Sequence, residues 1–242
     1  MTDPAGVAVE TDEEVRAQQL IAAEARAVEL FDAVVARGIL RPGVSERAAS
    51  DTVRDLAADM FDVDRFWHKR IVRAGPNTLH PYSENPPDRD IAEDDIVFLD
   101  LGPVLEQWEA DLGRTYVVGD DARKHALAAS VQTVWDGARD HFAATEDITG
   151  EQLYDHVCRL AADAGWEFGG SIAGHLVGQF PHKHISGSEV GSYIAPGSRE
   201  PMRRRDRAGL TCHWILEVHL VDRDVGIGGF FEQLLDIGPN AR

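Results

Sequence analysis

The stretch DIVFLDLGPVLEQWEADLGRTYVV, residues 95–118, contains two apolar runs of the kind that form β-strands. We expect the two runs to pair as an antiparallel hairpin. Asp100 ends the first run, and Asp111 stands eleven residues later at the start of the second. In such a hairpin both carboxylates can face one side of the sheet, where two like charges are costly unless a cation lies between them. For a single motif of this kind, a turn at the end of each strand is the simpler explanation.

Two further strand-like runs, CHWILEVHLVD (212–222) and GGFFEQLLDIG (228–238), lie near the end of the sequence. Alternation along the first run places Glu217 and His219 on one face and large apolar residues on the other. Glu232 stands between aromatic and leucine residues in the second run. Lone carboxylates are rare in such surroundings unless they are paired or bound to metal. The intervening segment can turn, so a second hairpin would bring Glu217 and Glu232 together.

A histidine pair follows a glycine-rich segment in GHLVGQFPHKH (174–184), where His182 stands seven residues after His175. A lone histidine here is more often a hydrogen-bonded core or loop residue. Together with four carboxylates in apolar strands, however, His175 becomes a candidate metal ligand. Four carboxylates and one imidazole suit a pair of Mn, Fe, Co or Zn ions, whose charges they balance. Such a pair of ions generates a hydroxide at neutral pH and polarises an amide carbonyl.

Helices are expected on both sides of these runs. Helical periodicity covers residues 13–37, Ser45 is an N-cap candidate for a helix that reaches Phe61, Asp120 or Asp121 caps a helix through residue 142, and Thr149 caps one through Ala164. Helices and strands mixed along one connected chain predict the α+β class. We expect residues 1–12 to be an acidic N-terminal tail and residues 13–242 to form one domain.

The composition excludes several kinds of partner. The 242 residues include 42 Asp and Glu against 24 Lys and Arg, a formal net charge of −18. Such a chain repels nucleic-acid phosphates and anionic membrane surfaces. No apolar run reaches the ~18 residues that a membrane span requires. Cys158 and Cys212 stand in no disulfide or zinc pattern, and the N-terminus is acidic, so we expect a cytoplasmic protein.

The ordered ligand candidates resemble the five-ligand signature of the pita-bread metallopeptidases, the family of methionine aminopeptidase, aminopeptidase P, prolidase and creatinase. The five residues are Asp100, Asp111, His175, Glu217 and Glu232. The spacing of the two Asp, the Arg-Thr after Asp111, the interval between His175 and His182, and the segments GPNTLHPY (75–82) and RPGVSE (41–46) match the family as well. The resemblance covers residues 15–238 and implies one pita-bread domain, a curved antiparallel sheet with flanking helices.

The resemblance also implies roles for individual residues. Asp111 and Glu232 would bridge two divalent metal ions, Asp100 would bind one ion, and His175 with Glu217 the other. Mn is the first expectation for the metal, with Co, Fe or Zn as alternatives. Glu217 would also move the proton between water and the leaving amine. The side chains expected to bind the substrate and stabilise the oxyanion are His80 and His182. A homodimer is a further expectation.

Some positions depart from the family pattern. Leu176 follows His175 where Gly is usual, Lys183-His184 replaces Glu-x-Pro, and Gln107-Trp108 replaces Gly-Tyr. These changes do not affect the five candidate ligands, but they leave the identity of the substrate undetermined. Two roles are equally expected for Trp108: binding of substrate and packing in the core.

Other polar residues are given simpler roles. Arg114 is expected to pair with a carboxylate of the site. The basic cluster of Arg203, Arg204, Arg205 and Arg207 is expected to be a solvated loop or a subunit contact, in preference to a clamp for a substrate carboxylate. Core packing is slightly preferred for His219 over a contact at the site. Structural roles are assigned to His68, His125, His141, His156 and His213.

The function expected first is a dinuclear-metal hydrolase that cleaves an amide or peptide bond near a free amino terminus, as an Xaa-Pro dipeptidase or aminopeptidase does. The first alternative is a creatinase-like hydrolase of a small, non-peptide C–N bond. The second alternative is a non-catalytic binding module on the same fold, which would have no reason to keep five buried ionisable residues.

Overall fold

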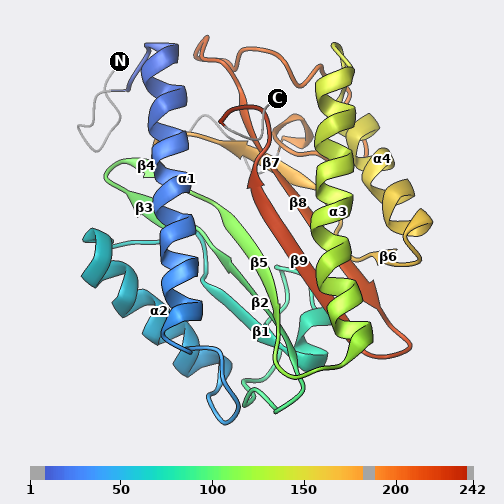
Figure 1. Cartoon of the computed structure of the whole chain (residues 1–242). Helices are drawn as coiled ribbons and strands as arrows, with labels where there is room; N and C mark the ends of the chain where they lie inside the picture. The colour runs from blue at the N-terminus through green and yellow to red at the C-terminus, as the bar shows by residue number, and fades with distance from the viewer. Residues whose placement is uncertain (1–8, 182–188, 239–242) are drawn as a thin grey trace.

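The computed structural model describes residues 9–181 and 189–238, and its centre is a curved antiparallel sheet (Figure 1). The strands of this sheet follow the order β1-β2-β5-β9-β8-β6, and β7 also pairs with β8. Their bounds are β1 Ile71–Ala74, β2 Ile96–Leu101, β5 Leu112–Val117, β6 Glu167–Phe168, β7 Gly174–Val177, β8 His213–Asp222 and β9 Ile227–Leu234. The segment between β2 and β5 forms a separate small hairpin of β3 (Val104–Leu105) and β4 (Trp108–Glu109). The predicted α+β class and curved antiparallel sheet are therefore confirmed.

The described helices begin where side-chain oxygens accept backbone N–H groups. Their bounds are α1 Glu13–Ala36, α2 Glu46–Phe61, α3 Ala122–Ala144 and α4 Gly150–Asp163, with short 3₁₀ turns at Gly75–Leu79 and Val190–Ser192. Ser45, Asp121 and Thr149 cap α2, α3 and α4, and Thr149 forms a reciprocal capping box with Gln152. These caps confirm the predicted helix starts. None of the described helices combines the length and apolarity needed to cross a membrane.

The long helices α1 and α3 lie on the same face of the sheet (Figure 1). Alternate residues of β8 pack against α3 in one buried cluster, which includes Trp214, Leu216, Val218 and Leu220. Helices α1 and α2 cover strands β1 and β2 through a second cluster. The alternation predicted for residues 212–222 is therefore confirmed, and it turns Glu217 and His219 away from the helices.

One row of paired positions crosses four neighbouring strands. Asp100 on β2 is opposite Gly113 on β5, Gly113 is opposite Glu232 on β9, and Glu232 is opposite Glu217 on β8. Residues directly opposite one another in antiparallel strands project to the same face. A Cβ atom added at Gly113 would collide with the Phe230 ring and approach the Cβ of Glu232 at 3.0 Å. The lack of a side chain at Gly113 therefore leaves room for the carboxylates on either side.

Candidate metal centre

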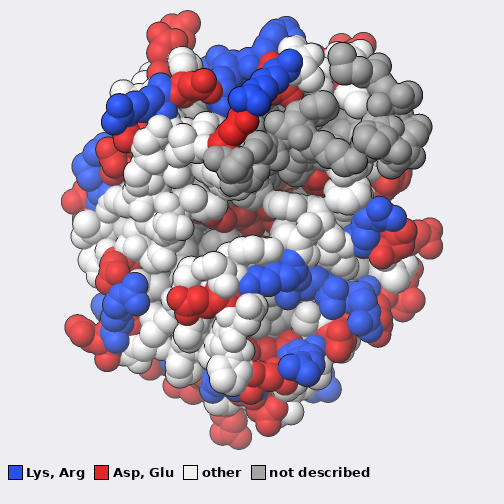
Figure 2. Space-filling model, turned by 180° about the vertical axis from the view of Figure 1, so that it is seen from behind, with Lys and Arg blue, Asp and Glu red and all other residues white. Residues whose placement is uncertain are grey.

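The five predicted ligand residues all line one cavity of about 460 Å³. The cavity lies on the face of the sheet opposite α3, because Glu217 alternates with the β8 residues that pack on that helix. Figure 2 looks onto the molecule from behind and shows red carboxylate atoms inside a central hollow. The structure thus brings together residues that are up to 132 positions apart in the sequence.

Asp111 lies at the centre of the cluster. Its Oδ2 atom is 3.0 Å from Nε2 of His175, and the same nitrogen is 3.9 Å from Oε1 of Glu232. One ligand atom from each of these three residues can be chosen so that all lie within 4.8 Å of one another. This spacing is compatible with a single metal ion held between a carboxylate pair and an imidazole.

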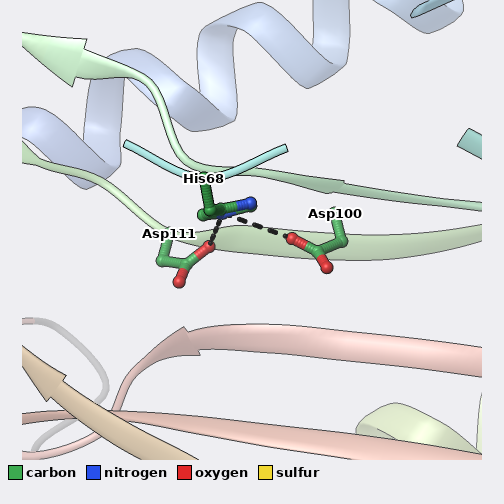
Figure 3. A group of neighbouring side chains, drawn as sticks. All are labelled: His68, Asp100 and Asp111. Atoms are coloured by element: carbon green, nitrogen blue, oxygen red, sulfur yellow. Dashed lines mark hydrogen bonds and ion pairs between the residues drawn. The ribbon is translucent and has the colours of Figure 1, made fainter. Parts of the chain in front are cut away.

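His68 corrects one expectation from the sequence, because its ring lies inside the cluster rather than in an ordinary structural position. Its Nε2 atom is 3.0 Å from Oδ1 of Asp111 and 3.4 Å from Oδ1 of Asp100, and its side chain is only 7% exposed. Figure 3 shows the ring between the two carboxylates. His68 precedes β1, and no spacing motif links it to the other residues. No feature of the sequence singles it out as a member of the site.

Burial changes the acidity of the carboxylates unequally. It raises the pKa of Asp100 to about 6 and that of Glu217 to about 7, and it raises the pKa of Glu232 well above its usual value, with neighbouring carboxylates adding to the effect at each position. Burial would also raise the pKa of Asp111, but the adjacent His68 and His175 outweigh it and lower this pKa to about 2. The raised pKa values of Asp100, Glu217 and Glu232 therefore show that several negative charges cannot be buried together here without a cost.

The two imidazoles respond in the opposite direction. Burial alone would lower the pKa of each ring, but the charge of Asp111 outweighs burial and raises the pKa of His68 to about 10 and that of His175 to about 9. Without metal, the folded chain therefore holds cationic imidazoles between its carboxylates. Divalent ions would take over this role of charge compensation.

One buried oxygen of the cluster has no partner among the described residues. Oε2 of Glu232 makes no hydrogen bond, although the side chain is 2% exposed. An unsatisfied buried carboxylate oxygen is costly unless an ion or a proton satisfies it. Carboxylate oxygens together with imidazole nitrogens form a donor set that suits Mn, Fe, Co or Zn. The residues present therefore fit a divalent metal.

Arg114 fixes the strands beneath the site without touching its carboxylates. The guanidinium donates to the backbone oxygens of Gly113 and Glu232 at 2.7 and 2.8 Å, and to the side-chain oxygen of Gln233 at 2.5 Å. It also lies over the Phe231 ring. The expected pairing with a site carboxylate is thus replaced by hydrogen bonds to the backbone that carries one. These bonds hold β5 against β9 where only one residue pair is in register.

The residues predicted to contact substrate are placed differently from one another. His80 lines the cavity with a side chain 37% exposed, and its Nδ1 is 2.6 Å from Oε2 of Glu84. Trp108 is 7% exposed and packs in the cluster with α1, and it is not among the residues that line this cavity. Of the two roles expected for Trp108, the structure therefore supports core packing, because the β3–β4 hairpin turns the side chain into the core. His182 lies outside the described residues.

His219 and the arginine loop (residues 203–207) both form hydrogen bonds to backbone oxygens of the domain. His219 lines the cavity and donates from Nε2 to the backbone oxygen of Thr78 at 2.8 Å, and burial lowers its pKa to about 4. Arg203 donates to the backbone oxygens of Phe142 and Thr145 at the end of α3, and Arg204 to that of Gly191. The loop is therefore attached to the domain rather than merely solvated.

Comparison with known proteins identifies a family that matches this chain. A family model described as metallopeptidase family M24 matches residues 18–208. The chain belongs to this family. The sequence is 28% identical over 149 residues to an Xaa-Pro dipeptidase of Lactobacillus delbrueckii subsp. lactis, an alignment that covers 61% of this chain and 40% of that protein. The M24 chain thus spans less than half the length of this curated relative.

Solved structures share the fold of this M24 chain. A prolidase from Thermococcus sibiricus superposes with a TM-score of 0.65 at 23% identity, over 94% of this chain and 59% of the other. A methionine aminopeptidase from Rickettsia prowazekii superposes with a TM-score of 0.67 at 16% identity, over 94% of this chain and 95% of the other. The predicted pita-bread fold is thereby confirmed.

Proposed function

We propose that this chain is a metal-dependent M24 hydrolase that holds two divalent ions and cleaves an amide or peptide bond near a free amino terminus. The observation that carries the proposal is a pair of candidate ligand groups that share Asp111, one with His68 and Asp100 and the other with His175 and Glu232. Both groups lie in the same cavity. A carboxylate that belongs to both groups could hold two adjacent ions together, as in two-metal hydrolase sites.

In this proposal Asp111 and Glu232 would be shared by the two ions, Asp100 would hold one of them, and His175 with Glu217 would hold the other. When bound, such ions lower the pKa of a coordinated water and polarise the carbonyl of the substrate. Mn is the first metal to test because oxygen ligands predominate, followed by Co, Fe and Zn. The unpartnered oxygen of Glu232 supports this assignment.

Glu217 is the proposed proton carrier. Burial raises its pKa to about 7 in the metal-free chain, and a bound divalent ion would lower it again, so that the carboxylate form is the one that accepts a proton. The side chain lines the cavity beside Glu232, its partner on the next strand. A carboxylate in this position would accept a proton from water, and the resulting carboxylic acid would return it to the leaving amine. His80, on the wall of the same cavity, is the proposed donor to the substrate carbonyl, and His182 is proposed to act with it.

The walls of the cavity suit the end of a small peptide. Aromatic and apolar side chains supply much of the lining, among them Trp67, Ile71, Tyr82, Phe98 and Phe230. A volume of about 460 Å³ is typical of sites that enclose a small molecule. The likeness to an Xaa-Pro dipeptidase favours Xaa-Pro dipeptides as the first substrates to test. The single domain, the homodimer and the cytoplasmic location stay predictions.

The test is a substrate screen with the purified chain in Mn²⁺ or Co²⁺. Free Xaa-Pro dipeptides and unblocked peptides should be hydrolysed, and their N-acetylated counterparts should not. Turnover of small guanidino or amide compounds alone would instead favour the creatinase-like alternative. Bound metal without turnover of any of these compounds would contradict the proposed hydrolase and favour a binding module.

A further inference from the structure

His68 is held in the same way as the predicted ligand His175. Its Nδ1 atom is 2.8 Å from the backbone oxygen of Lys69, and Nδ1 of His175 is 2.9 Å from the backbone oxygen of Leu176. In both cases the acceptor belongs to the next residue. A carbonyl oxygen only accepts hydrogen bonds, so each Nδ1 must carry a hydrogen. Each Nε2 then faces the carboxylates, which is the orientation that metal-binding histidines adopt.

Trp67 fixes both imidazoles in place. Its ring meets His68 edge-on at 4.5 Å and His175 at 5.3 Å between centroids. The indole Nε1 donates to the backbone oxygen of Ala110 at 3.1 Å, directly before Asp111. A Cβ atom at Gly102 would collide with the His68 ring and with Trp67. The position of His68 therefore follows from close packing rather than from a flexible side chain.

We infer that His68 is a sixth ligand of the metal centre, supplying its Nε2 to the ion that Asp100 and Asp111 hold. This inference rests on the proposed dinuclear function. One ligand atom each from His68, Asp100 and Asp111 lies within 4.8 Å of the others, as is true of the group with His175. Each ion would then have one imidazole and at least two carboxylates.

A nitrogen ligand on both ions has a chemical consequence. Imidazole suits Zn, Fe and other later transition metals, whereas sites built of oxygen alone favour Mn or Mg. The chain should therefore bind Co²⁺ or Zn²⁺ more tightly relative to Mn²⁺ than a variant without the His68 imidazole. The competing explanation is that His68 only donates a hydrogen bond from Nε2 to Asp111 and touches no ion.

The deciding experiment is proton NMR of the full chain loaded with Co²⁺, with the bound cobalt measured on the same sample. Imidazole N–H protons of residues bound to Co²⁺ are displaced far from the ordinary range. We expect two such signals, from the Nδ1–H groups of His68 and His175. His68→Gln and His68→Phe should each remove one signal and weaken the binding of one Co²⁺ at least 10-fold by calorimetry, with a smaller loss for Mn²⁺.

His213 provides a matched control. It is also a buried histidine between two carboxylates, but Asp236 occupies its Nδ1 and Glu13 its Nε2, and it does not line the cavity. His213→Gln should keep both displaced signals and both Co²⁺ affinities. Fewer than two displaced imidazole signals in the unmodified chain with Co²⁺ bound would overturn the inference and leave the proposed function standing. Failure to bind Co²⁺ at all would contradict the inference and the proposed function together. The number of displaced imidazole signals in the unmodified chain does not depend on whether a variant folds.

Discussion

Glu217 and Glu232 are direct partners on the adjacent strands β8 and β9, so two carboxylates share one interior position of the sheet. Like charges opposite one another destabilise a sheet, and burial increases the cost. Asp100 and Asp111 line the same cavity and add to the charge. A divalent ion bound among these carboxylates is therefore expected to stabilise the fold, in place of the protons and cationic imidazoles that balance them without metal. This links the stability of the chain to the function proposed for it.

Metal removal should lower thermal stability. An ion that binds only the folded chain at 100 times its dissociation constant contributes about 2.7 kcal/mol. For a domain of this size, that corresponds to a decrease in Tm of roughly 5–10 °C. The measurement is calorimetry before and after dialysis against a chelator, and then after Co²⁺ or Mn²⁺ is restored. An unchanged Tm in all three samples would contradict the expected dependence.

Replacing Glu217 with Gln should separate metal binding from proton transfer. The amide keeps an oxygen that can face an ion but cannot exchange a proton near pH 7. We expect kcat on an Xaa-Pro dipeptide to fall about 10²–10⁴-fold, with at least one ion per chain retained. The measurements are steady-state kinetics and metal analysis of the same preparation. Full kcat in this variant would rule out Glu217 as the proton carrier.

Gly113→Ala tests the space beside Glu232. The new methyl group would collide with the Phe230 ring and lie only 3.0 Å from the Cβ of Glu232, so the ring or the strand must shift to accept it. We expect a loss of about 1–3 kcal/mol in the free energy of unfolding, together with weaker metal binding. Gly137→Ala is the control, because Gly137 lies inside α3 and its nearest neighbour is a flexible Leu160 methyl at 3.1 Å. Equal changes in stability and metal binding for the two variants would show that the close approach of Gly113 to Phe230 and Glu232 does not matter.

Glu24, which lies outside the metal centre, should make the stability of the chain depend on pH. Burial raises its pKa from 4.5 to about 7, while its Oε2 accepts the backbone N–H of Leu234 at 2.6 Å. The folded chain therefore binds this proton more tightly than the unfolded chain. Its contribution is fully present below pH 4.5 and is lost as the pH rises through 7. Glu24→Gln keeps an acceptor oxygen without the charge.

The expected gain from Glu24→Gln is about 1–3 kcal/mol larger at pH 8 than at pH 5. Urea unfolding of metal-free protein at the two pH values measures this difference. Glu29→Gln, at an exposed position on the same helix, should change stability by similar amounts at both. An equal effect of Glu24→Gln at pH 5 and pH 8 would show that Glu24 is ionised without cost.

Local patterns predicted much of this architecture because each depends on near neighbours in the sequence. Alternation in residues 212–222 separated the helix-packed face of β8 from the face that carries Glu217, and capping side chains predicted where α2, α3 and α4 begin. The order of acidic residues and His175 predicted which side chains the sheet gathers. That these residues bind metal stays a prediction.

His68 and Trp108 were harder to predict because their positions depend on packing between distant segments. The His68 ring is placed by Trp67 and by the space at Gly102, neither of which forms a recognisable motif. Trp108 lies on a strand of only two residues, too short for alternation to show which side is buried. Both required the three-dimensional structure.

The most direct test of the central claim is the number of ions bound per chain. Equilibrium dialysis of the metal-free protein against Co²⁺, followed by elemental analysis, should find two tightly bound ions. Asp111→Asn should reduce this number, because Asp111 belongs to both candidate ligand groups. One ion or none in the unmodified chain, or two ions retained by Asp111→Asn with unchanged affinity, would contradict a dinuclear centre built on Asp111.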